Sequence, residues 1–228
     1  MNRLWVGATV LAAGAIFWGV GQAVNPSSGD TEFKKTLESI KHVKSFRGAY
    51  LDGSSGSHSE RLWEVDCNQV IVHEQSHDSQ GGSDSAFDMK QDELLVGEQR
   101  YQRDGDGSWE NRGYAGERYS AKWYCDNLAH GTARDLLPDM YTLVSHAMTE
   151  KGDKKTVNGV RCQEWKFALR TAVAADGGSL CIGLDDHLPY EMTMKNGGHY
   201  SYSDYNRPIE FEAPAAVLQS ASSTGGSN

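Results

Sequence analysis

The chain has little positive charge and lacks several motifs that mark common enzymes. Its 22 Lys and Arg are outnumbered by 31 Asp and Glu, so the formal net charge is −9, or −10 once Arg3 is lost with a leader. A surface of this sign repels nucleic acid. The chain has no Gly-rich phosphate loop, no G-x-S-x-G turn and no long repeat. We therefore expect no nucleic-acid partner and no cofactor.

The first 23 residues are typical of an export signal. Arg3 precedes a run from Leu4 to Val20 without charge, and Gly21-Gln-Ala23 offers small residues where a signal peptidase cuts. The run is also long enough to stay as a membrane anchor. No Cys lies near its end, so lipid attachment there is not expected. We predict a bacterial periplasmic or secreted protein, cleaved after Ala23 or held by this N-terminal anchor.

Export predicts that the four cysteines form disulfides, because disulfides persist in oxidising compartments. Four cysteines allow three possible sets of two disulfides. We favour Cys162–Cys181, since both lie in consecutive strand-like segments, and this leaves Cys67–Cys125.

Hydrophobic periodicity predicts one β-rich domain with two helices. Residues 24–29 read as a linker, 30–214 as the domain and 215–228 as a disordered tail. Helical spacing predicts helices from Asp30 to about Lys44 and from Thr132 to Lys151. Most other segments alternate as strands, whereas 76–85 reads as a polar loop. Two apolar helices among antiparallel strands must bury their faces on the sheet, which favours a strongly curved sheet with helices on its concave side.

The C-terminal run predicts how the sheet ends. Tyr200 and Tyr202 share one face of a strand, and 204–208 supplies turn residues. Ile209 and Phe211 then alternate with glutamates, so we expect a final short strand that stops at Pro214.

Four motifs in this order resemble the LolA-like family and the related LppX/LprG-like proteins. They are Glu93–Trp109 (ELLVGEQRYQRDGDGSW), Val157–Trp165 (VNGVRCQEW), Asp186–Pro189 (DHLP) and Tyr202–Pro214 (YSDYNRPIEFEAP). The resemblance implies a mainly β (α+β) fold, a curved antiparallel open half-barrel with helices in the concave face. It also implies a carrier of acyl chains or lipoproteins. The chain departs from LppX-like members in having no lipidation Cys, and from LolA in having extra cysteines.

Apolar, aromatic and Met side chains of the strands and the second helix are candidates to line a ligand cavity. Such side chains can adapt to acyl chains of varied shape. They are Trp63, Val65, Leu95, Tyr101, Trp109, Leu137, Met140, Val144, Trp165, Phe167, Met192 and Met194. A closed core made of the same residues is the alternative. The wide apolar stripe from Leu136 to Met148 leads us to expect that the second helix is a movable lid over this face.

A rival motif is His73-Glu-Gln-Ser-His77, which matches H-E-x-x-H. On a helix, His73 and His77 would bind zinc and Glu74 would serve as general base. The β-branched residues before the motif disfavour a helix. In a strand the two histidines would lie roughly 13 Å apart, which is too far to share one ion.

The residues, together with the resemblance, predict a monomeric, non-enzymatic carrier or sensor that binds an acyl chain, a lipoprotein or another apolar ligand. Envelope donor and acceptor proteins are the expected partners. The alternatives are a zinc-dependent hydrolase and a structural envelope protein without ligand.

Overall fold

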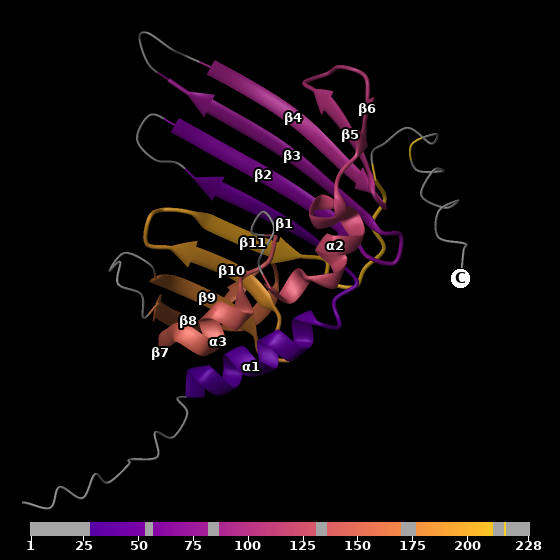
Figure 1. Ribbon diagram of the computed structural model, residues 1–228. Helices are drawn as coiled ribbons and strands as arrows, with labels where there is room; N and C mark the ends of the chain where they lie inside the picture. Colours follow the sequence, from indigo (N-terminus) through magenta and orange to yellow (C-terminus); the bar gives the residue numbers. More distant parts are fainter. Residues whose placement is uncertain are drawn as a thin grey trace, which may run out of the picture.

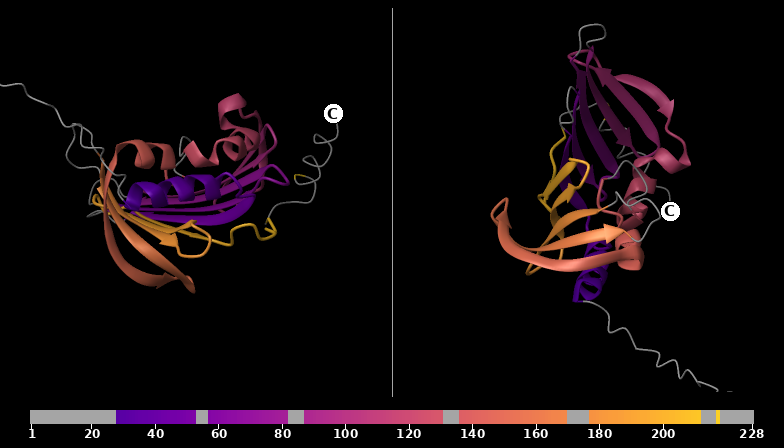
Figure 2. Two further views of the ribbon diagram at one scale, coloured as in Figure 1. Left: turned by 90° about the horizontal axis from the view of Figure 1, so that it is seen from below. Right: turned by 90° about the vertical axis from the view of Figure 1, so that its left-hand side faces the viewer.

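The computed structural model of the protein describes residues 28–52, 57–81, 87–130, 136–169, 177–211 and 217. The predicted leader lies outside these residues. Within them, eleven strands form one antiparallel sheet in the order β6-β5-β4-β3-β2-β1-β11-β10-β9-β8-β7. Its edges, β6 and β7, do not pair, so the sheet is open. Figure 2 shows it curved around the helices, as a half-barrel with helices on its concave side.

The chain builds one half of the sheet, crosses it with helices, and then builds the other half (Figure 1). The first half is β1 Ser45–Asp52, β2 Ser57–Asp66, β3 Ile71–Gln80, β4 Phe87–Val96, β5 Gln99–Asp104 and β6 Glu110–Tyr114. The second is β7 Ala147–Val157, β8 Val160–Leu169, β9 Gly177–Gly183, β10 Pro189–Met194 and β11 His199–Ser203. The last strand, β11, pairs with the first, β1, and so joins the halves.

The helical layer has several short pieces besides α1 Ser28–Ile40. They are the 3-10 turns Glu117–Tyr119 and Leu128–His130, α2 Ala121–Asp126 and α3 Met140–His146. Helix α1 forms over most of the predicted segment, because Phe33, Leu37 and Ile40 fall on one face and are buried, but it ends at Ile40 and not near Lys44. Ser120 caps α2 by accepting a hydrogen bond from the Trp123 amide, and Asp139 caps α3 in the same way through Thr142.

Three predictions about segments were wrong. The second helix is α3, Met140–His146, and is much shorter than the predicted 132–151: residues 136–139 are not helical, and 131–135 lie outside the described residues. Ala147–Val157 is strand β7, because Met148 and Glu150 alternate with residues that face the helices. Residues 76–80 belong to β3 and not to a loop. Residues 204–211 form no strand, although Ile209 is buried.

The hairpin between β7 and β8 shows how local sequence fixes register. Asn158 and Gly159 both have positive φ, at 50° and 80°. A two-residue hairpin turn of this kind matches the right-handed twist of the flanking strands, and Asn-Gly favours it. The turn pairs Val157 with Val160 and sets the register as far as Lys154, beyond which an irregularity between Lys151 and Lys154 shifts the pairing.

Candidate functional site: the inner face of the sheet

The face of the sheet that points to the helices, here called the inner face, carries most of the hydrophobic core. Directly paired residues in antiparallel strands point to the same face, and successive residues alternate. The pairing therefore defines rows of side chains that cross the inner face. One apolar row contains Phe46, Val65, Val72 and Leu95. All four are at most 4% exposed and pack in one cluster with α1.

A second row changes character along its length. In the second half of the sheet it contains Trp165, Leu180, Met192 and Tyr200, all apolar or aromatic. It continues through Tyr50 on β1 and then becomes polar, with Arg61, Ser76 and Gln91. In Figure 1 these ends of β2 to β4 extend at the upper left beyond the helices. The inner face therefore has a helix-covered apolar part and an uncovered polar part.

The helix-covered part is closed by side chains from α3 and the segment before it. Leu137 and Met140 are at most 2% exposed, Leu143 is buried, and Val144 is half-buried against the same cluster. Helix α1 adds Phe33 and Ile40, both fully buried. The space between Val72, Leu95, Tyr124 and Leu136 has no room for a water molecule. The apolar part is a packed core in this structure.

Most of the candidate cavity residues meet in this one core. Those on the inner face or in the helical layer are Trp63, Val65, Leu95, Leu137, Met140, Val144, Trp165, Phe167, Met192 and Met194. Whether they hold a ligand stays a prediction. Gly48 lies opposite Trp63, and a Cβ at this glycine would stand 3.0 Å from the indole ring, so the missing side chain gives the ring its place.

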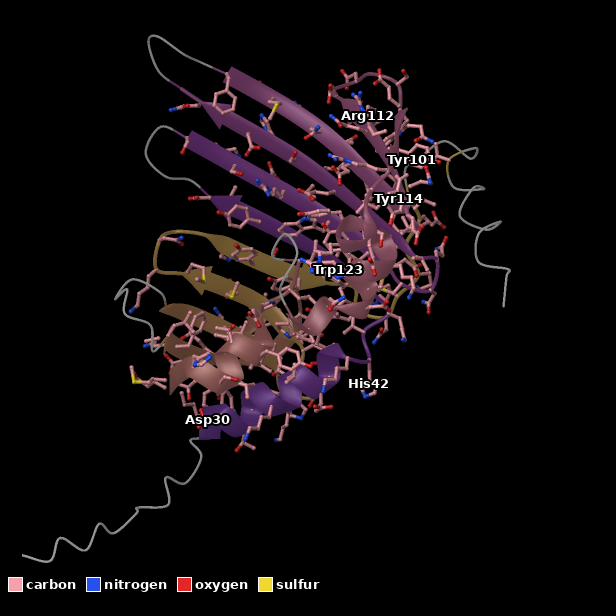
Figure 3. All side chains as sticks on the ribbon, in the orientation of Figure 1. Asp30, His42, Tyr101, Arg112, Tyr114 and Trp123 are labelled. Atoms are coloured by element: carbon pink, nitrogen blue, oxygen red, sulfur yellow. A yellow bond between two sulfur atoms is a disulfide. The ribbon has the colours of Figure 1, made fainter. Side chains whose placement is uncertain are left out.

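Tyr101 and Trp109 lie on the other side of the sheet. Tyr101 pairs with Leu94, whose side chain faces away from the helices, and both belong to a smaller cluster with Ile71 and Val96. Trp109 and Phe211 pack against this cluster. Tyr101, marked in Figure 3, was assigned to the wrong face because a period-two pattern does not say which face is inner. These two residues are not part of the inner-face core.

A hollow of about 570 Å³ lies at strands β7 to β10. Its apolar lining includes Met148, together with Phe167 and Met194, which also pack in the inner-face core. The lining contains two lysines, Lys166 and Lys195, and two glutamates, Glu150 and Glu164. Most of its lining side chains alternate onto the face that points away from the helices, as the pairing of Glu150 with Lys166 shows. Its mixed lining of apolar and charged side chains distinguishes it from the inner-face core.

The polar part of the inner face forms a smaller hollow of about 270 Å³, which no motif or spacing along the chain indicated. Arg100 Nη2 lies 2.6 Å from Glu93 Oε2, and Arg61 Nη1 lies 3.9 Å from Glu74 Oε1. Each arginine thus lies near a glutamate, and the third carboxylate, Asp78, accepts a hydrogen bond from Ser59. Its lining contains no apolar side chain, which makes it a poor site for an acyl chain.

Both predicted disulfides are present. Cys67, just after β2, is bonded to Cys125 in α2, so this bridge ties the helical layer to the sheet. Cys162 and Cys181 bridge the neighbouring strands β8 and β9. No free cysteine remains in the chain.

The H-E-x-x-H motif lies on strand β3, and this excludes its helical interpretation. Glu74 is on the inner face, opposite Trp63, whereas His73 and His77 alternate to the outer face. His73 is 3% exposed, its ring centroid lies 5.9 Å from that of Trp109, and its Nδ1 is 3.3 Å from Glu64 Oε2. The hydrogen bond with His73, followed by that from Arg47, lowers the pKa of the Glu64 carboxyl below its usual value. The motif's residues therefore belong to two different environments.

Comparisons with known proteins identify the fold. Neither a protein-family model nor a curated protein matches the chain. The crystal structure of LprF from Mycobacterium bovis matches with a TM-score of 0.57 at 10% identity, over 82% of this chain and 96% of that one. MucB in the Pseudomonas aeruginosa MucA/MucB complex matches at 18% identity with a TM-score of 0.38, over 83% and 61%. A putative outer membrane lipoprotein-sorting protein domain from Vibrio parahaemolyticus matches at 7% identity with a TM-score of 0.24, over 82% and 99%.

The chain has the LolA-like fold, as the sequence resemblance predicted. No helix in the described part of the chain is long and apolar enough to cross a bilayer.

Proposed function

We infer that the protein is an exported, non-enzymatic carrier or sensor that binds an acyl chain, or a similarly apolar ligand, on the helix-covered part of its inner face. One observation carries this proposal: a single open sheet presents a continuous apolar surface that is covered only by short helices. A ligand reaches that surface when the helical layer moves, without any strand pair being broken. The fold shared with LprF supports the same proposal.

Helix α3 is the part of the layer best suited to move. It covers the sheet with Met140 and Leu143, and apolar contacts are non-directional. An acyl chain supplies the same kind of contact, at about 0.8 kcal/mol per buried CH₂. Specific ties hold the other two helices: Cys125 joins α2 to the sheet, and Glu32 Oε1 of α1 lies 2.6 Å from His187 Nδ1. Ligand would then replace α3 on the Trp and Met side chains of β8 to β10.

The disulfides support an extracytoplasmic location, because bridges of this kind persist in the periplasm or outside the cell. Lipid or lipoprotein chains are the proposed cargo, and donor and acceptor proteins of the envelope are the proposed partners. The protein acts as a monomer in this proposal.

Neighbouring residues of β10 provide a matched test. Met192 faces the inner core and is 9% exposed, whereas Thr193 alternates to the other face. Met192→Gln keeps the side-chain volume but places an amide against the acyl chain, which costs about 1–3 kcal/mol when the amide is unpaired. We expect affinity for a fluorescent fatty acid to fall about ten-fold or more in this variant. Thr193→Gln should bind as the wild type does.

Native mass spectrometry of the periplasmic protein, with metal analysis, separates the alternatives. Co-purified lipid supports the carrier, and stoichiometric zinc with hydrolytic activity supports an enzyme. Neither would be found for a structural envelope protein. Wild-type fatty-acid affinity in a folded Met192→Gln protein would remove the inner face from consideration as the site.

A further inference from the structure

Three metal-ligating side chains meet on the outer face of the sheet, far from the helices. They are His58 and Glu60 on β2 and His77 on β3. His58 and Glu60 are two residues apart and so share a face, and Glu60 is paired directly with His77. His73 and His77 are too far apart along β3 to share an ion, whereas His58 on β2 lies close to His77 across the two strands.

The separations suit one ion. One ligand atom from each side chain lies within 4.8 Å of the other two, and His58 Nε2 is 3.9 Å from Glu60 Oε2. Ligands bonded to tetrahedral zinc at about 2.0–2.1 Å are about 3.4 Å apart. The side chains are 33–45% exposed, so small rotamer adjustments close the difference.

A fourth group supports one of these ligands. Asp88 Oδ1 on β4 lies 2.6 Å from Nε2 of His77. A carboxylate on the second nitrogen of a metal-binding histidine fixes the ring and raises its basicity. The cluster therefore resembles a ligand set with its supporting carboxylate, built from three adjacent strands.

We propose that His58, Glu60 and His77 form a surface site for a divalent transition-metal ion of the zinc or copper kind. Two imidazoles and one carboxylate are donors that suit these ions, and hard cations such as Mg²⁺ prefer all-oxygen sites. The ion would join β2 to β3 at the end of the sheet that the helices leave uncovered. This inference is independent of the acyl-chain proposal, since the site lies on the opposite face.

Titration calorimetry of the tag-free, metal-stripped exported chain with Zn²⁺ tests the site. We expect one saturable site, with affinity at least ten-fold lower in His58→Ala and in His77→Ala. Asp88→Asn, which alters only the supporting carboxylate, should weaken binding about ten-fold. With Cu²⁺, electron paramagnetic resonance should show nitrogen coupling that is lost in the two histidine variants.

Two further variants keep the test specific. His42 is an exposed histidine at the far end of α1, marked in Figure 3, and His42→Ala should bind Zn²⁺ as the wild type does. His73→Gln removes the other histidine of the H-E-x-x-H motif and should also leave binding unchanged. Absence of saturable binding, or binding that survives in His77→Ala, would overturn the proposal. Loss in His73→Gln with retention in His58→Ala would do the same.

Discussion

The two halves of the sheet carry different kinds of side chain along the same row of inner-face positions. In β8 to β10 this row holds Trp165, Leu180 and Met192, whereas in β2 to β4 it holds Arg61, Ser76 and Gln91. The backbone pattern is continuous across both halves, so the difference lies in what covers the row. Side chains beneath α1 and α3 lose their water and are apolar, and those beyond the helices are hydrated and polar. The inner face therefore offers apolar contacts at its helix-covered end and polar contacts at its uncovered end.

The largest effect is expected from a charge placed under α3. Met140 is fully buried, and an unpaired aspartate there loses its hydration, at a cost of several kcal/mol. We expect Met140→Asp to abolish ligand retention if the protein still folds, and otherwise to unfold the domain. Circular dichroism beside the binding assay separates these outcomes.

Met148 is the matched control, because it is 54% exposed on β7, just after the same helix. Met148→Asp should change the free energy of unfolding by less than about 0.5 kcal/mol. Equal effects of the two substitutions in urea unfolding would show that α3 does not cover the apolar part.

The two disulfides are expected to differ. The loop closed by Cys67–Cys125 has a separation of 58 residues, and that closed by Cys162–Cys181 has 19. Chain-entropy arguments give about 4 and about 3 kcal/mol, respectively. Replacing each pair with serines and measuring urea unfolding checks the order.

Of the two disulfides, only Cys67–Cys125 joins the helical layer to the sheet. Loss of this disulfide should also weaken fatty-acid binding by a folded protein, because α2 is then no longer held at a fixed position on the sheet. A larger loss of binding on removing Cys162–Cys181 would contradict this assignment of the covered part.

A moderate effect is expected from acid. The folded pKa of Glu64 is lowered, first by its hydrogen bond with His73. The stability that it contributes is present above the unfolded pKa of about 4.3 and is lost as the pH falls through the lower folded value. Glu64→Gln should therefore remove part of the loss of stability below about pH 4, as measured by urea unfolding across pH. An unchanged pH profile would contradict the importance of this outer-face contact.

The smallest effect is expected in the uncovered part. Ser76 lies in the polar hollow on β3, and its hydroxyl is 3.4 Å from the Gln91 carbonyl oxygen. Ser76→Ala should alter the unfolding free energy by less than about 0.5 kcal/mol and leave fatty-acid affinity unchanged. A clear loss of affinity would extend the ligand site into the polar part.

Local patterns predicted much of this fold. The bounds of β1, β8 and β10 follow from alternation and turn residues, and α1 follows from the spacing of Phe33, Leu37 and Ile40. Strand β7 was missed because Ala147 and Met148 continue the apolar stripe of α3. Which structure forms there depends on pairing with β8, which lies later in the chain.

The candidate site residues were harder to predict, because they depend on register. The prediction that Tyr101 lies on the inner face was wrong. Alternation shows which residues share a face, but it does not show which face points to the helices. The proximity of His58 to His77 requires the pairing of β2 with β3, and no spacing along the chain encodes it. The resemblance to LolA-like proteins predicted the fold, but it did not predict that side chains fill the space under the helices.

Photo-cross-linking tests the central claim most directly. A fatty acid with a diazirine near its end would be bound to the wild-type protein, irradiated and mapped by peptide mass spectrometry. We predict adducts on inner-face residues such as Trp165 and Met192, and on α3. Adducts confined to Met148 and Lys166 in the hollow at β7 to β10, or the absence of any specific adduct, would contradict the account.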